Sequence, residues 1–371
     1  MEELIKIHVG LDVHKDSITV ARALPGREDA RLVGSVAHDV PKLLKVLAKL
    51  GSPEQLHLVY EAGPTGFGLQ RALRGRGYTC EVIAPSKTPR KAGSRIKTDT
   101  RDAIDLARYS RSGELSAIWI PDPADEAIRD LVRAREDAVQ ARTQARHQLS
   151  AFLLRHSKVY AGKTKWCGVH DRWLAAVSFE SSPSQTAFTE YWQAAKSVDA
   201  RVERLSTALL GAIDGWRFEP VVGALQTMRG IAALTAISLV AEIGDFERFG
   251  SACQLMGYLG LVPSEQSSGD KTSRGSITKT GNGHARKLLT ESAWNYRFAA
   301  RISKDIQARQ EGASEAVRAI AWKAQLRLTR RFAALNARGV QKNKVCVAVA
   351  RELAGFVWAV GRQAQRESSL N

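Results

Sequence analysis

The most constraining feature of the sequence is an alternation of β-rich and helical segments before residue 114. The β-rich segments have apolar, often β-branched side chains, are bounded by polar or Gly/Pro-containing turns, and lie at residues 4–12, 17–23, 31–36, 55–61 and 79–84. Helical periodicity appears in three further segments, residues 39–50, 66–76 and 98–113. Three strands followed by strand–helix repeats predict an α/β layer with a mixed sheet.

The rest of the chain has a helical pattern. Pro121 and Pro123 mark a boundary, after which residues 124–156 run without Gly or Pro and are rich in Ala, Arg, Leu and Gln. A second long helical pattern at residues 186–213 predicts an antiparallel, coiled-coil-like arm, although an ordinary two-helix connector fits the same pattern. Helical patterns also dominate from residue 219 onward. The predicted domains are residues 1–121, 122–218 and 219–371.

The charge balance indicates a polyanionic partner. Lys and Arg number 55 against 38 Asp and Glu, which gives a net charge of +17. Such an excess is typical of nucleic-acid-binding proteins, although a ribosome-associated or membrane-surface protein could carry it too. Hydrophobic residues make up 44% of the chain, a share that excludes disorder throughout.

Cysteine usage and hydropathy indicate the compartment. The four cysteines are far apart and lack paired spacing, so neither a disulfide framework nor a cysteine-based zinc site is expected. The first residues do not resemble a signal peptide, and we expect no membrane span because no apolar run is long enough. These features predict a reducing cytoplasm.

Carboxylates stand at positions where α/β folds build their sites. Asp12 ends the first predicted strand and Glu61 the fourth, so neighbouring parallel strands would bring both to one sheet edge. Asp99, Asp102 and Asp105 share one helix face because they are three residues apart. Each acid alone fits a turn or cap residue, but together they would repel one another unless a cation offset their charge. Mg²⁺, which prefers oxygen ligands, would enable phosphoryl transfer on nucleic acid.

Residues 263–283 form the stretch richest in Gly, Ser, Thr and Lys. It fits a solvated linker as well as a loop that handles phosphate groups. Ser267 and Ser268 could act as nucleophiles, but a serine hydroxyl needs a base or metal beside it and nothing local supplies a base. The side chains expected to contact nucleic acid are Lys271, Arg274, Lys279, Asn282 and Arg286.

Three local sequences resemble one family. Residues 10–15 (GLDVHK), 60–66 (YEAGPTG) and 97–103 (KTDTRDA) together are similar to the DEDD transposases of the insertion-sequence-110 family, which are related to Piv-type invertases. The resemblance implies a ribonuclease H-like, RuvC-type fold for the N-terminal domain. It also implies a metal-binding tetrad of carboxylates that holds two Mg²⁺ ions, or Mn²⁺ in their place. The tetrad is Asp12, Glu61, Asp99 and Asp102, with Asp105 as the alternate fourth carboxylate.

The C-terminal half carries the same resemblance. Residues 259–263 (LGLVP), 268–269 (SG) and 277–282 (ITKTGN) are similar to the family's mostly α-helical transposase domain. The match implies that Ser268 is the catalytic nucleophile, with Ser267 as the fallback because the two serines are adjacent. It further implies donor and target DNA, a guide (bridge) RNA, and a bacterial or archaeal nucleoid setting, while the arm suggests a dimer or tetramer.

Two other functions remain compatible with the residues. A RuvC-like, structure-specific nuclease would use the carboxylates and water, would form no covalent intermediate, and would still cut after Ser268→Ala. A non-catalytic nucleic-acid-binding protein would bind without Mg²⁺ and would tolerate loss of Glu61. The expected function is that of an insertion-sequence transposase that cuts and rejoins DNA.

Overall fold

The computed structural model describes residues 6–89, 98–268 and 271–370, and the chain divides into two compact units, Met1–Ile120 and Pro121–Asn371. The three-domain division stays a prediction. Across the described ranges no helix combines the length and the apolar character needed to cross a bilayer.

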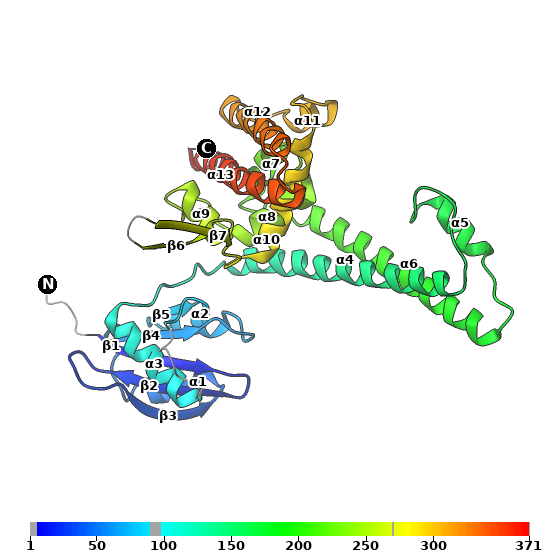
Figure 1. Ribbon diagram of the computed structural model, residues 1–371. Helices are drawn as coiled ribbons and strands as arrows, with labels where there is room; N and C mark the ends of the chain where they lie inside the picture. Colours follow the sequence, from blue (N-terminus) through cyan, green and yellow to red (C-terminus); the bar gives the residue numbers. More distant parts are fainter. Residues whose placement is uncertain (1–5, 90–97, 269–270, 371) are drawn as a thin grey trace. The chain divides into compact units, whose positions relative to one another are not determined.

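A five-stranded mixed sheet in the order β3-β2-β1-β4-β5 forms the first unit (Figure 1). The strands on one side of β1 pair antiparallel, whereas β1, β4 and β5 run parallel. This arrangement confirms the mixed sheet that the sequence predicts. The bounds are β1 Ile7–Val13, β2 Ser17–Ala23, β3 Arg31–Ala37, β4 Leu56–Glu61 and β5 Thr79–Ile83.

Helices cover both faces of this sheet. Leu43 of α1 and Leu69 of α2 belong to one apolar cluster with Leu11 and Leu58 of the sheet. Small side chains dominate the opposite face, where α3 packs through alanines against β2. Because both faces of the sheet are covered, most side chains of β1 and β4 are apolar. The helical segments are α1 Val40–Leu47, η1 Pro53–Gln55, α2 Gly68–Arg74 and α3 Asp99–Ser112.

Two long helices, α4 (Pro123–Arg155) and α6 (Ser182–Gly211), pack along each other in the second unit (Figure 1). Asp122 caps the start of α4, and the proline that follows it occupies the first helical turn, where no backbone donor is needed. Phe152 of α4 and Phe188 of α6 share an apolar cluster that also includes Leu174 of α5, Gly168–Ala176. The two long helices predicted from the sequence are confirmed.

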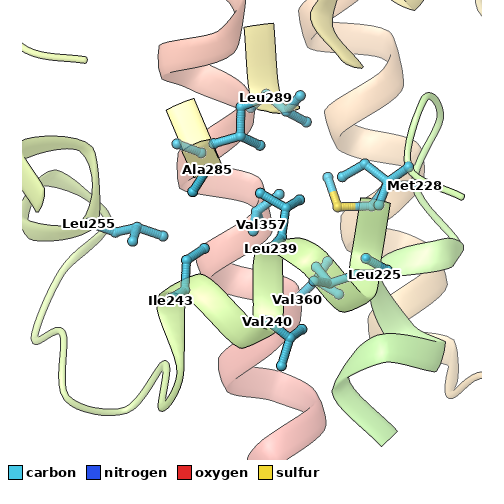
Figure 2. Packing of buried hydrophobic residues seen from close by; sticks show 14 of the residues in the cluster. Leu225, Met228, Leu239, Val240, Ile243, Leu255, Ala285, Leu289, Val357 and Val360 are labelled. Carbon is cyan, nitrogen blue, oxygen red and sulfur yellow. The ribbon is translucent and has the colours of Figure 1, made fainter. Parts of the chain in front are cut away.

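The remaining helices enclose the largest apolar core. Helix α8 is buried along its second half, because a helix that is apolar on all sides needs neighbours around it. Figure 2 shows Ile243 of α8, Leu255 of α9, Ala285 of α10 and Val357 of α13 within this core. The helical segments are α7 Glu219–Gln226, α8 Ala233–Ile243, α9 Ala252–Tyr258, α10 Gly283–Ala293, η2 Trp294–Arg297, α11 Lys304–Arg309, α12 Glu315–Ala337 and α13 Lys342–Leu370.

An antiparallel hairpin of β6 (Pro263–Ser268) and β7 (Lys271–Ile277) interrupts these helices. The sequence predicts a loop here within a mostly α-helical domain, and the two paired strands correct that prediction. The two segments carry no helical apolar stripe, and their Ser and Thr side chains suit an extended, solvated ladder. Ser268 pairs with Lys271 in the register, so two residues, 269–270, join the strands outside the described part of the chain.

Candidate active site

Two carboxylates stand at the carboxyl-terminal edge of the sheet. The parallel register pairs Leu11 of β1 with Tyr60 of β4, so the next residues, Asp12 and Glu61, come at the same edge of adjacent strands. The side chain of Asp12 is 17% exposed, so it is mostly enclosed at this edge. The expected meeting of the first and fourth strands is therefore confirmed, and the catalytic roles of these acids stay a prediction.

Gly10 brings α3 close to this edge. A Cβ atom at Gly10 would lie 2.2 Å from the backbone oxygen of Ala103 and 2.6 Å from the backbone nitrogen of Ala107. The helix backbone thus rests directly on β1, and only a glycine permits the approach. Because Asp12 follows Gly10 by two residues, this contact fixes where the first turn of α3 lies relative to the strand end.

The first turn of α3 contributes two more acids. The Thr98 hydroxyl accepts a hydrogen bond from the Arg101 backbone N–H at 3.4 Å and caps the helix. Asp99 and Asp102 follow in the first turn, where the positive end of the helix dipole favours negative charge. The motif read from the sequence as KTDTRDA is thus a cap followed by two carboxylates on one face.

His14 joins the strand edge to the helix. Its Nε2 atom lies 3.0 Å from Asp12 Oδ2 and 3.5 Å from Asp99 Oδ1. The backbone N–H of His14 donates to Ser17 at 2.9 Å, and the His38 ring contacts the His14 backbone oxygen at 2.6 Å. These bonds hold the turn between β1 and β2 that presents the imidazole. Sequence analysis missed His14, although the GLDVHK motif contains it.

Electrostatics at Asp12 show how crowded this edge is. Burial raises the pKa of the Asp12 carboxyl, and the negative charges of Asp99 and Asp102 add to the increase. The His14 ring opposes it through its hydrogen bond and its charge. A divalent cation would stabilise the ionised form of Asp12 in the same way, because it offsets the repulsion between the acids.

The donors present fit a divalent cation. One ligand atom each from Asp12, His14 and Asp99 lie within 4.8 Å of one another. Carboxylate oxygens suit Mg²⁺ and Mn²⁺, and an added imidazole nitrogen favours Mn²⁺ over Mg²⁺. Asp105, the alternate acid, instead forms an ion pair with Arg108 one turn along α3. The Asp105 carboxylate therefore contacts an arginine and does not belong to the group of Asp12, His14 and Asp99.

The serine of interest lies in the second unit. Ser268 ends β6, and the register pairs Ser267 with Thr272 on β7. The backbone of this hairpin is described, whereas the side chains of several predicted site residues lie outside the described part of the structure; these are Ser267, Ser268, Lys271 and Arg274. For these positions the roles expected from the sequence stay predictions.

Three other predicted contact residues follow the hairpin. Lys279 is exposed and has a positive φ of 56°. Asn282 caps α10, because its side-chain oxygen accepts from the Ala285 backbone N–H at 2.9 Å. The Arg286 guanidinium donates to the backbone oxygens of Leu259 at 2.8 Å and Thr280 at 3.0 Å. Asn282 and Arg286 are therefore engaged in holding the chain beside the hairpin.

Comparison with known families matches both units. The model of IS110-type DEDD transposases, described as "Transposase", matches residues 9–157, which include every acid of the predicted tetrad. A second model, described as "Transposase IS116/IS110/IS902 family", matches residues 222–308, which include the hairpin. The DEDD match implies a ribonuclease H-like fold and the use of a divalent metal, in agreement with the mixed sheet and the grouped donors.

Individual relatives are similar over most of their length. A putative transposase, y4qE, of Sinorhizobium fredii is 44% identical over 97% of this chain and 90% of its own. The transposase for insertion sequence element IS1533 of Leptospira borgpetersenii is 32% identical over 88% of this chain and 96% of its own. The transposase for insertion sequence element IS1111A of Coxiella burnetii is 24% identical over 78% of this chain and 73% of its own. This chain therefore belongs to the IS110 family of DEDD transposases, which cut and rejoin DNA.

Proposed function

We propose that this transposase cuts DNA with the hydroxyl of Ser268 and rejoins it through a covalent phosphoserine. Divalent metal ions, Mg²⁺ in the simplest case, would be held by four carboxylates, those of Asp12, Glu61, Asp99 and Asp102. The observation that supports the proposal most is the grouping of Asp12, His14 and Asp99 ligand atoms within 4.8 Å, at the strand edge that also presents Glu61.

The proposed reaction conserves the number of phosphorus–oxygen bonds. The Ser268 hydroxyl loses its proton as Oγ bonds to the phosphorus, while the bond from phosphorus to the 3′ oxygen breaks and that oxygen leaves as a hydroxyl. A 3′-hydroxyl of the joining strand later attacks the phosphoserine, loses its proton and displaces Oγ, which recovers a proton. The covalent intermediate stores the bond, so rejoining needs no external energy source. Bound divalent ions would offset the charge on the attacking and leaving oxygens.

The chain's own residues would divide this work. The carboxylates would bind the metal ions and so orient the DNA phosphate. His14 would add a further ligand or hold the Asp12 carboxylate in place. Lys271, Arg274 and Lys279 would contact phosphates beside the serine. Attack by Ser268 requires its oxygen within about 3–3.5 Å of the phosphorus, so the hairpin must dock on the carboxylates when DNA is bound.

The test is to trap the intermediate. A nicked duplex that spans one end of the element should accumulate a protein–DNA adduct, because the cut strand cannot be rejoined. Mass spectrometry of the digested adduct should locate the DNA on Ser268. Ser268→Ala should abolish the adduct, and Ser267→Ala is the matched control that should keep it.

Three outcomes would overturn this mechanism. An adduct that persists in Ser268→Ala would move the nucleophile elsewhere. Strand cutting without any adduct in the wild-type protein would favour a nuclease that uses water, and binding without cutting at any Mg²⁺ concentration would favour a non-catalytic role.

A guide RNA and self-association are also part of the proposal. The net charge of +17 leaves capacity for a structured RNA besides DNA, and the α4–α6 arm offers a surface on which dimers or tetramers could form. Sequencing of RNA that co-purifies with the protein should show strong enrichment of a transcript from the element's own non-coding end. A random sample of cellular RNA would contradict guidance.

A further inference from the structure

Glu242 is a buried acid that the proposed chemistry does not use. It stands one residue before the end of α8 and is 3% exposed. Its neighbour Ile243 points into the apolar core between α9 and α10 (Figure 2). A carboxylate in such a place is costly unless several donors surround it, so its partners indicate what it does.

Four donors from two other helices surround this carboxylate. Arg133 of α4 donates through Nε at 3.0 Å and through Nη2 at 3.2 Å. Asn282 donates from Nδ2 at 2.7 Å, and His284 Nδ1 lies 3.5 Å away. Burial by itself raises the pKa of Glu242, but the bonds from His284, Arg133 and Asn282 outweigh burial and lower the pKa to about 2. The group is therefore ionised at every working pH.

Asn282 links Glu242 to the end of the serine hairpin. Its side chain caps α10 and also bonds to Glu242, and its backbone N–H donates to Tyr258 at 3.2 Å. One residue earlier, Gly281 has φ +69°, and a Cβ there would lie 1.9 Å from the Tyr258 oxygen. The chain that leaves β7 is thus pressed against the end of α9, which leads into β6.

Backbone hydrogen bonds close the base of the hairpin. The Thr278 N–H donates to Val262 at 2.9 Å, and the Lys279 N–H donates to Gly260 at 3.1 Å. These two bonds, together with the Asn282 contacts, join the segments on either side of β6 and β7. We call residues 259–262 and 278–282 the hairpin base.

The same carboxylate connects the hairpin base to the arm. Arg133 lies on α4, and one turn later Glu136 accepts from Lys287 of α10 at 2.5 Å. A cavity of about 320 Å³ lies among these groups. Its lining residues come from α4, α8 and the start of α10, and they are Arg133, Glu136, Asp137, Glu242, Asn282, Gly283 and His284.

We propose that Glu242 is a positioning residue: it holds the hairpin base in one orientation against the arm, and so aims the strand that ends in Ser268. The inference rests on the proposed role of Ser268. It assigns Glu242 no contact with DNA. Its effect passes through Asn282, which begins α10, and through Arg133, which belongs to the arm.

Asp125 provides a matched control. It lies on α4, is 2% exposed like the buried Glu242 of α8, and accepts from Trp216 Nε1 at 2.8 Å and from Arg217 Nε at 3.2 Å. Both carboxylates therefore tie α4 to the helical core through an arginine. The partners of Asp125, Trp216 and Arg217, lie in the segment before α7 and not in the hairpin base.

The experiment compares Glu242→Gln with Asp125→Asn in the full-length protein with its co-purified RNA. Amide hydrogen exchange in this protein without DNA should rise about tenfold or more at the hairpin base in Glu242→Gln and stay near wild type there in Asp125→Asn. Single-turnover cutting of the nicked duplex should slow about 10- to 100-fold in Glu242→Gln alone, with its Kd for the duplex within about threefold of wild type.

A second variant separates positioning from simple loss of stability. In Glu242→Gln combined with Asn282→Asp, amide and carboxylate exchange places, so the bond between the two positions and the helix cap are both retained. This double variant should recover part of the cutting rate lost in Glu242→Gln, because the bond to position 282 is restored whereas Arg133 Nη2 loses the oxygen that it shares with Asn282. Equal slowing in Asp125→Asn, or unchanged exchange at the hairpin base in Glu242→Gln, would overturn the inference.

The outcomes also distinguish this inference from the serine mechanism. Hydrogen exchange reports on the hairpin base whether or not Ser268 is the nucleophile. Loss of protection in Glu242→Gln with an unchanged cutting rate would overturn positioning and leave the Ser268 adduct test unaffected. An adduct that persists in Ser268→Ala would overturn the serine mechanism and, with it, the reason for positioning.

Discussion

The Nε2 atom of His14 lies 3.0 Å from a carboxylate oxygen of Asp12, two residues earlier in the chain. The same nitrogen is 3.5 Å from Asp99 on α3, so one imidazole bridges the strand edge and the helix. A neutral imidazole in this place is a ligand that suits Mn²⁺ better than Mg²⁺.

We expect His14→Ala to weaken Mn²⁺ binding about tenfold or more and Mg²⁺ binding less, as measured by calorimetric titration of each ion. His147→Ala, which removes an exposed histidine on α4, should leave both affinities unchanged. Equal losses for the two ions after His14→Ala would show that the ring only supports Asp12 and is not itself a ligand.

Gly10→Ala should destabilise the first unit by about 1–3 kcal/mol, because the new methyl group would overlap the backbone of α3 at Ala103. The displaced helix should also weaken metal binding, since Asp99 and Asp102 move with it. Thermal unfolding and metal titration check both effects. Gly68→Ala is the control: a Cβ there meets nothing within 4 Å, so stability should be unchanged or slightly higher.

Glu61→Gln should abolish strand cutting and leave DNA affinity near wild type, because an amide cannot replace the carboxylate charge at the metal. Asp105→Asn should keep most of the cutting activity. Its partly exposed pair with Arg108 contributes about 1 kcal/mol or less to stability. Cutting assays at several Mg²⁺ concentrations, with binding measured on the same duplex, compare the two variants. Loss of cutting in Asp105→Asn would make this acid the fourth carboxylate.

Glu242 should make the free energy of unfolding depend on pH in the acid range. Its pKa is lowered in the folded protein from 4.5 to about 2, so its contribution is fully present above pH 4.5 and is lost as the pH falls toward 2. The shift corresponds to about 3 kcal/mol. Urea unfolding of wild type and Glu242→Gln at several pH values should show a wild-type advantage near neutral pH that shrinks by about this amount in acid. A difference between the two proteins that does not change with pH would contradict the lowered pKa.

The sheet and its acids could be predicted because their signals are local. Apolar, β-branched segments separated by turns indicate β1 to β5, and a strand that ends in Asp12 or Glu61 places its acid at a predictable edge. The close approach of the α3 backbone to Gly10 of β1 could not be predicted from such local signals. Gly10 in a strand has no distinctive pattern until the Ala103 backbone is seen beside it.

The hairpin was missed because its signal is weak. Ser, Thr and Lys in β6 and β7 are as typical of a solvated loop as of a polar ladder, and cross-strand pairing is what makes them extended. Asn282 is predicted from the sequence to contact nucleic acid, and that contact stays a prediction. In the structure its side chain caps α10 and bonds to Glu242.

The sequence by itself determined the order of strands and helices in the first unit, the acids at the carboxyl ends of β1 and β4, and the family to which the motifs belong. These follow from periodicity, turns and short motifs, whose physical causes act between neighbouring residues. Only the tertiary structure decided that His14 bridges Asp12 and Asp99, and that Arg133, Glu242 and Asn282 share one buried network. Those contacts join residues far apart in the chain, and only packing selects which polar side chains are buried together.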